Sequence, residues 1–187
     1  MKSMVLFLLG LMVPVAATAA TEDARRVQSA EIVERFQETL GQRLKQALTA
    51  GGPVAAIAVC QREAPAIAAR LSAETGARVG RTALRVRNPA NQPDADARAV
   101  LERFDQAIRA GVERPPESFE VMRDGQARYL KAIVTQPICL NCHGATVDPQ
   151  VEQALARHYP DDQARGYAAG DLRGAFFVHW PASRGGD

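Results

Sequence analysis

Cysteine and aromatic residues are scarce in this chain of 187 residues, which has three cysteines and only 5% aromatic side chains. Cys139 and Cys142 form the only Cys-x-x-Cys pair, so a zinc site built from two such pairs is excluded. The charge is almost balanced, at +2, which excludes the strongly basic composition typical of nucleic-acid binding. Beyond residue 15 no long apolar run occurs, so the sequence predicts no membrane span in the mature chain.

One apolar run is present, at the N-terminus. Met4 to Val15 is almost entirely apolar, follows the positive charge of Lys2 and precedes the small residues Ala17-Thr18-Ala19. This pattern predicts a secretory signal peptide over residues 1–20 and a periplasmic mature protein. A membrane anchor is the alternative, but the run is shorter than the roughly 20 apolar residues that span a bilayer.

The two paired cysteines belong to the run Cys139-Leu140-Asn141-Cys142-His143, which has the Cys-x-x-Cys-His pattern of covalent haem attachment. Two thiols at this spacing can add across the two vinyl groups of one haem, and the adjacent histidine then offers a ring nitrogen to the iron. A chance match, a thioredoxin-like dithiol and half of a zinc site are the alternatives. Export favours haem, because c-type haem is attached outside the cytoplasm. The sequence therefore predicts one covalent haem c, with His143 as an iron ligand.

Helical periodicity covers the first part of the mature chain. Apolar residues at three- and four-residue steps predict a long helix over residues 21–51, ended by Gly51-Gly52-Pro53. A second helix is expected over residues 53–75, kinked or restarted at Pro65. Cys60 lies on the apolar stripe of this second helix, where spacing alone predicts a small buried hydrophobe, the usual role of an unpaired cysteine.

The rest of the chain mixes strand and helix patterns. The expected elements are a strand over 81–87, a helix over 95–110, a hairpin with arms 119–122 and 126–135 around Asp124-Gly125, a helix over 149–158 and a strand over 174–180. This order predicts an α+β fold in which helices flank an antiparallel sheet. We expect one domain over residues 21–181 and a disordered tail over 182–187.

Three arginines alternate with apolar residues in the strand expected over residues 81–87. Arg81, Arg85 and Arg87 would then form a row of guanidinium groups on one strand face. Such a row could bind the propionates of a haem, because arginine pairs well with carboxylates. A solvated strand face explains the same pattern equally well.

Several stretches together resemble one protein family, which covers nearly the whole mature chain. They are AIAVCQREAPAIA (56–68), VGRTALRVRNPANQPD (79–94), PICLNCHG (137–144) and YPDDQARGYAAGDLRGAFFV (159–178). The chain resembles the single-haem c-type family with a PAS-like fold, whose members occur as exported single domains and as outer sensory domains of bacterial signalling proteins. The resemblance implies a PAS-like sheet flanked by helices, a covalent haem, and redox or small-molecule sensing.

Four side chains remain as candidates for the other axial position of the iron, unless that position is open. They are Cys60, Met122, His158 and His179. Cys60 is the one candidate on an apolar helical face, and it lies in a stretch that carries the family resemblance. That resemblance favours Cys60 as the second metal ligand beside His143. A thiolate stabilises ferric iron, so a low midpoint potential is expected.

Two functions follow as expectations. The first is a sensor in which loss of the thiolate on reduction opens a site for a diatomic gas such as CO or NO. The alternative is a periplasmic electron-transfer cytochrome. An enzyme is not expected, because no acid–base pair for peroxidase-like chemistry can be identified in the sequence. Either function needs a separate redox or signalling protein as partner.

Overall fold

The computed structural model describes residues 15–182. Residues 1–14 of the predicted signal peptide and 183–187 of the predicted tail lie outside the described residues, so both remain predictions. The elements, in chain order, are α1 (Val15–Ala58), the π-helical turn η1 (Val59–Glu63), α2 (Ala64–Thr75), β1 (Arg78–Thr82), η2 (Pro89–Asn91), α3 (Ala95–Arg109), β2 (Glu117–Val121), β3 (Ala127–Val134), η3 (Pro137–Cys139), α4 (Leu140–His143), α5 (Pro149–His158) and β4 (Leu172–Trp180).

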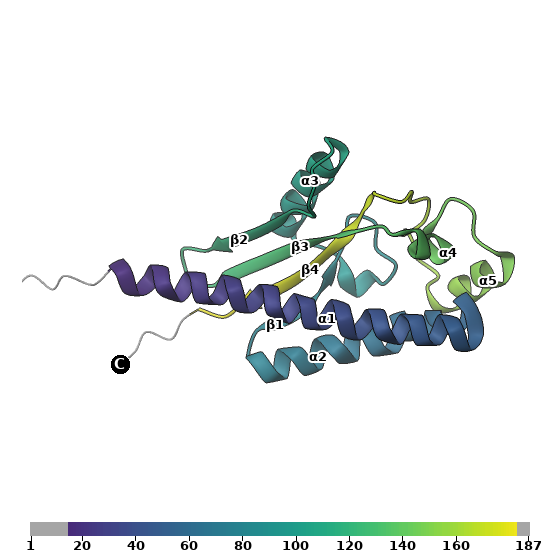
Figure 1. The fold of residues 1–187 in the computed structure, drawn as a ribbon, viewed down its shortest axis with the longest axis horizontal. Helices are drawn as coiled ribbons and strands as arrows, with labels where there is room; N and C mark the ends of the chain where they lie inside the picture. The colour runs from purple at the N-terminus through teal and green to yellow at the C-terminus, as the bar shows by residue number, and fades with distance from the viewer. Residues whose placement is uncertain (1–14, 183–187) are drawn as a thin grey trace, which may run out of the picture.

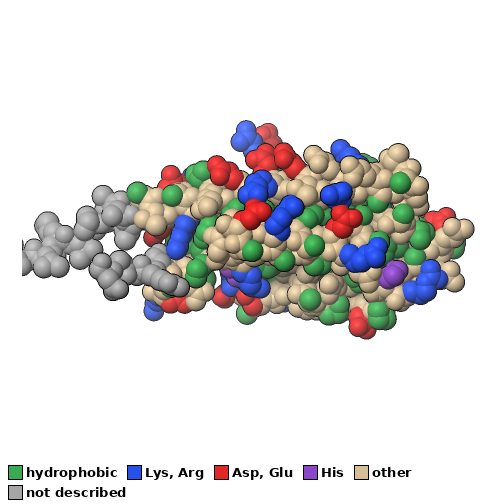
Figure 2. All heavy atoms as spheres, turned by 90° about the horizontal axis from the view of Figure 1, so that it is seen from below, with side chains coloured by type: hydrophobic (Ala, Val, Ile, Leu, Met, Phe, Trp, Pro, Cys, Tyr) green, Lys and Arg blue, Asp and Glu red, His purple; other side chains and the backbone are tan. Residues whose placement is uncertain are grey.

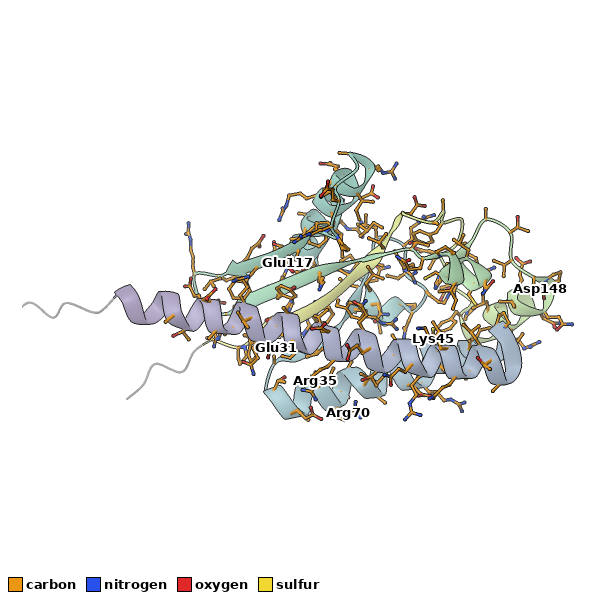
Figure 3. All side chains as sticks on the ribbon, in the orientation of Figure 1. Glu31, Arg35, Lys45, Arg70, Glu117 and Asp148 are labelled. Atoms are coloured by element: carbon orange, nitrogen blue, oxygen red, sulfur yellow. The ribbon has the colours of Figure 1, made fainter. Side chains whose placement is uncertain are left out.

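Helix α1 runs along almost the whole length of the molecule (Figure 1). Its backbone leaves helical geometry at Gly51 and at Gly52, where φ is 69°, so the predicted end of the long helix at Gly51-Gly52-Pro53 is confirmed. Glycine adopts this positive φ without steric cost. α2 then runs back beside α1, and the ion pair between Arg35 and Glu74, at 2.6 Å, joins the two helices (Figure 3).

A four-stranded sheet has the order β1-β4-β3-β2, and all neighbouring strands are antiparallel. Helices α1 and α2 cover one face and α3 covers the other (Figure 1). On the first face Phe36 of α1 packs against Phe176 of β4, with ring centroids 5.1 Å apart. The predicted α+β architecture, with helices flanking an antiparallel sheet and a long N-terminal helix, is confirmed.

Most of the other expected elements are confirmed within a few residues. The hairpin joins β2 to β3 through Asp124-Gly125, and Gly125 has a φ of 77°. Helices α3 and α5 begin where they were expected, and each starts with an aspartate N-cap, Asp94 and Asp148 (Figure 3). Pro65 lies in the first turn of α2, directly after the π-helical turn.

The strand predicted over residues 81–87 is wrong in its bounds. β1 is Arg78–Thr82, and its pairing with β4 ends at Thr82. Beyond Thr82 the chain leaves the sheet, because the Arg87 guanidinium bonds to the carbonyl of Cys142 in the attachment motif. Only Arg81 therefore lies on a strand, and the predicted row of three guanidinium groups on one strand face does not exist.

Gly174 of β4 allows a close backbone approach to the end of β1. A Cβ atom at this position would collide with the carbonyl oxygen of Thr82 and lie 3.0 Å from the Cβ of Ala83. We expect Gly174→Ala to lower the free energy of unfolding by about 2 kcal/mol, because the strands must separate. Urea denaturation measures this. Gly41→Ala in α1 is the control, because a Cβ at this position meets nothing within 4 Å. It should raise the free energy of unfolding by about 0.5–1 kcal/mol, since alanine favours a helix more than glycine does. Equal stability of Gly174→Ala and the wild type would contradict the close approach.

The surface carries no dominant charge on the face seen in Figure 2, where acidic and basic side chains alternate. Among the helices between residues 15 and 182, none combines the length and the apolar character needed to cross a bilayer.

Candidate functional site

The attachment motif lies at the end of the sheet remote from the β2–β3 turn (Figure 1). β3 ends at Val134, and the chain passes through η3 into the single turn of α4, which contains Cys142 and His143. Cys139 and Cys142 are three residues apart in this helical stretch and therefore lie on the same side. Both thiols are free and partly exposed. This arrangement is compatible with two thioether bonds to one group.

His143 is held in one orientation by its backbone and its ring. Its carbonyl accepts a hydrogen bond from the Tyr167 N–H at 2.9 Å, and its Nδ1 lies 2.8 Å from the carbonyl oxygen of Ala164. Because a carbonyl only accepts, Nδ1 carries the proton, and Nε2 is the unprotonated nitrogen, which accepts a hydrogen bond from Arg173 Nε at 3.5 Å. Metal-binding histidines commonly have this second hydrogen bond, which fixes the tautomer.

Burial, as the largest cause, and the positive charges of Arg173 and Arg87 together lower the pKa of His143 to about 2. Arg173 Nε and Arg87 Nη1 each lie 3.5 Å from Nε2 of the imidazole. The ring is therefore neutral at physiological pH. A neutral imidazole with an unprotonated Nε2 is the form that binds iron.

The lowered pKa of His143 predicts acid sensitivity of the haem-free protein. The unfolded chain binds a proton below about pH 6.5, whereas the folded chain does not. Stability is thus fully present above pH 6.5 and falls by about 1.4 kcal/mol per pH unit as the pH decreases toward 2. Urea denaturation at about pH 7, 6 and 5 measures how steeply the free energy of unfolding falls with pH. His143→Gln should reduce this slope. The remaining slope is then due to His179, because burial lowers the pKa of His179 to about 4. An unchanged slope in His143→Gln would contradict the account.

A buried ion pair lies behind His143. Arg87 Nη2 is 3.1 Å from Asp162 Oδ2, and the two side chains are 8% and 3% exposed. Burial alone would raise the pKa of Asp162, but hydrogen bonds from Arg87, the Ala164 N–H and Arg165 hold it below its usual range. Arg87 is therefore a paired, buried group that connects loops around the motif, rather than a free cation for a ligand.

A cavity of about 580 Å³ opens beside His143, within the size range of cofactor sites. It is lined by η1, α2, β1, the segment 83–94 and β4, and both His143 and Cys60 contribute to its wall. Cys60 lies in the π-helical turn Val59–Glu63, between α1 and α2. Such turns are rare and are frequent at functional sites. The structure thus brings the two predicted metal ligands to one cavity, although the ligation itself stays a prediction.

Two half-buried arginines of this cavity lack an acidic partner. Arg81 and Arg173 both line it, and burial lowers the pKa of each guanidinium. No carboxylate between residues 20 and 182 lies within ion-pair distance of either one. A thiolate at Cys60 would raise the pKa of both, so the sulfur lies within electrostatic reach of the two cations.

The third arginine of the predicted row, Arg85, is an exposed side chain outside the wall of this cavity. Its guanidinium stacks over the ring of Tyr167 at 3.9 Å and donates to the carbonyl of Arg165 at 2.7 Å. Arg81, Arg85 and Arg87 therefore have three different environments. Whether they bind a cofactor stays a prediction, for which Arg81 has the most suitable surroundings.

The other candidate iron ligands lie farther from the motif or point elsewhere. Met122 is in the β2–β3 turn, at the opposite end of the sheet. His158 is exposed at the end of α5. His179 lines the far part of the same cavity, but its Nδ1 accepts a hydrogen bond from Arg78 at 2.9 Å.

Sequence reasoning missed Arg173, Asp162 and Tyr167 as residues of the site. All three lie in the stretch 159–178, which carried part of the family resemblance. Composition gives no signal for them individually, because their roles depend on a loop that returns to the motif. A parallel bridge between Gly144 and Tyr167 makes that connection.

Comparison with known proteins adds a family. A family model described as Tll0287-like matches residues 15–181. The chain belongs to the Tll0287-like family. The family resemblance seen in the sequence is thereby confirmed. A search of curated proteins gives no match.

A solved structure is also similar. It is the crystal structure of the cyanobacterial haem-protein Tll0287, with a TM-score of 0.65 and 24% sequence identity. The similarity covers 89% of this chain and 98% of that chain. At this identity the likeness establishes the shared fold of the Tll0287-like family, an α+β domain with a long N-terminal helix. The description of this fold as PAS-like stays a prediction.

Proposed function

We propose that this chain is an exported c-type haem protein with one haem, bound covalently through Cys139 and Cys142 and ligated by His143 and Cys60. Its function is redox or small-ligand sensing at low potential. Membership of the Tll0287-like family supports the haem, because a solved structure with the same fold is described as that of a haem-protein.

One observation carries the proposal. His143 contributes an unprotonated Nε2 to a cavity whose wall also holds a cysteine and two half-buried arginines without acidic partners, and one of them, Arg173, donates to that nitrogen. A haem fits this chemistry, because its iron needs the imidazole and its two propionates would neutralise Arg81 and Arg173. Among residues 15–182 no group of three or more His, Cys, Asp or Glu side chains converges to form another metal centre.

Cys60 determines the type of chemistry. A bound haem supplies one iron that changes between the ferric and ferrous states. Arg81 and Arg173 lie within electrostatic reach of the Cys60 sulfur. A thiolate favours ferric iron, so the potential is low, and the sulfur is expected to leave on reduction. Loss of the bond between the Cys60 sulfur and the iron would change the conformation of η1, which lies between α1 and α2. A sensor could transmit this conformational change to a partner.

Electron transfer is the second candidate, and one observation favours it. Ile138, directly before Cys139, is a large apolar side chain with 43% of its surface exposed. An exposed apolar residue beside the attachment motif suits a docking contact with a redox partner. In that case both axial ligands stay in place in both oxidation states.

A spectroelectrochemical titration of the purified holoprotein separates the two functions. The sensor predicts a strongly negative midpoint potential, a spectral change of ligand loss on reduction, and a further change on addition of CO. A reversible couple with unchanged ligation and no response to CO would overturn sensing and leave electron transfer.

A further inference from the structure

We propose that Asp162 and Arg87 are positioning residues that fix the imidazole of His143 and thereby set the reduction potential of the iron. This rests on the proposed haem binding. Asp162 acts through Ala164, whereas Arg87 acts both through the carbonyl of Ala164 and directly on the imidazole, where its Nη1 lies 3.5 Å from Nε2 of His143.

Asp162 holds Ala164 from the amide side. Its Oδ1 accepts a hydrogen bond from the Ala164 N–H at 2.9 Å, and its Oδ2 accepts one from Arg165 Nε, also at 2.9 Å. The carbonyl of Ala164 is in turn the acceptor for the Nδ1–H of His143 at 2.8 Å. A buried carboxylate therefore fixes the residue that orients the imidazole.

Arg87 holds the same residue from the carbonyl side. Its Nη2 donates to the carbonyls of Ala164, at 3.2 Å, and of Cys142, and contacts Asp162. One guanidinium group thus connects the attachment motif to the loop that carries the hydrogen-bond acceptor of His143. Its Nε is buried and has no hydrogen-bond partner within residues 20–182, so the connection depends on Nη2 and Nη1.

The charge of Asp162 also balances cations near the imidazole. Arg87 Nη1 and Arg173 Nε both lie 3.5 Å from His143 Nε2. Removing the carboxylate leaves more positive charge near the iron, which favours the ferrous state. A less restrained Ala164 carbonyl weakens the Nδ1 hydrogen bond and makes the imidazole a poorer donor. Both effects raise the reduction potential.

Asp162→Asn tests the proposal, with Asp94→Asn as its matched control. Asp94 also pairs with a buried arginine, Arg128, with contacts of 2.9 and 3.0 Å. It lies at the N-terminus of α3 and lines the same cavity, but it has no contact with the attachment motif or with Ala164, so it controls for the loss of a cavity carboxylate that does not hold His143. At one fixed applied potential, the ferric-to-ferrous ratio of Asp162→Asn should be about tenfold lower than that of the wild type. This corresponds to an upward shift of the midpoint potential by ~59 mV for one electron. In Asp94→Asn it should not change.

A second readout needs no haem. In the haem-free chain, ¹⁵N NMR of His143 should show the Nδ1–H tautomer in the wild type and in Asp94→Asn, and a mixture of tautomers in Asp162→Asn. If Asp162→Asn does not fold, Arg87→Lys replaces it, since lysine keeps the charge but cannot reach both carbonyls and Asp162 together. Arg87→Lys should show the same mixture.

Equal potentials in Asp162→Asn and Asp94→Asn, or an unchanged His143 tautomer, would overturn the positioning role. A wild-type protein without haem would overturn the proposed function instead, and the tautomer comparison would still decide the role of Asp162.

Discussion

Replacement of Cys60 by alanine is expected to change the ferric absorption spectrum and to raise the midpoint potential by an amount on the order of 100 mV, a part of the ~0.8 V range that axial ligands control. The reason is the loss of an anionic donor that lies within electrostatic reach of Arg81 and Arg173. Absorption spectroscopy and a potentiometric titration of the holoprotein measure the two effects.

The other sulfur and imidazole candidates provide the controls for Cys60. Met122→Leu, His158→Gln and His179→Gln should each retain the wild-type ferric spectrum, because these residues lie in the distant hairpin turn, at an exposed helix end, and in a hydrogen bond with Arg78. If Cys60→Ala keeps the wild-type spectrum and one of these three variants loses it, the ligand assignment is wrong.

Replacement of Arg81 or Arg173 by glutamine should have opposite effects on the haem-free and the haem-loaded protein. Each cation is half-buried without an acidic partner, so its loss should stabilise the haem-free chain by up to about 1 kcal/mol. In the haem-loaded chain the same change removes a partner of a propionate and should destabilise by a similar amount, about 1 kcal/mol. Urea denaturation of both forms measures the difference.

Arg85→Gln is the matched control for these two arginines. Its guanidinium stacks on Tyr167 outside the wall of the cavity, so the substitution should affect both forms of the protein equally. A uniform loss of stability in Arg81→Gln and Arg173→Gln, with and without haem, would show that these cations have a structural role and no anionic partner.

Much of the fold could be predicted because its signals are local. The glycine pair at 51–52 and the Asp124-Gly125 turn each determine the backbone over a few residues, and both occur where expected. Helices α3 and α5 also begin where expected, each after an aspartate N-cap that the structure shows. The exception is the segment 81–87. Its alternation has the period of a strand, but the chain is drawn away from β4 by contacts to the motif more than 50 residues later, such as Arg87 to Cys142. No local pattern records such a contact.

The candidate site divides in the same way. His143 and the two motif cysteines could be found from spacing, because the chemistry of attachment fixes that spacing. The position of Cys60 on the apolar face of a helix could be predicted from the sequence, whereas the π-helical turn that contains it could not. Asp162 and Arg173 join the site only through the returning loop and β4, so their roles required the three-dimensional structure.

Covalent attachment of one haem through Cys139 and Cys142 is the central claim, and a denaturing gel stained for haem peroxidase activity tests it most directly. The full chain is produced in a host competent for cytochrome c maturation, beside the double variant Cys139→Ala/Cys142→Ala. We predict a stained wild-type band and an unstained band for the double variant. A colourless wild-type band would contradict the account.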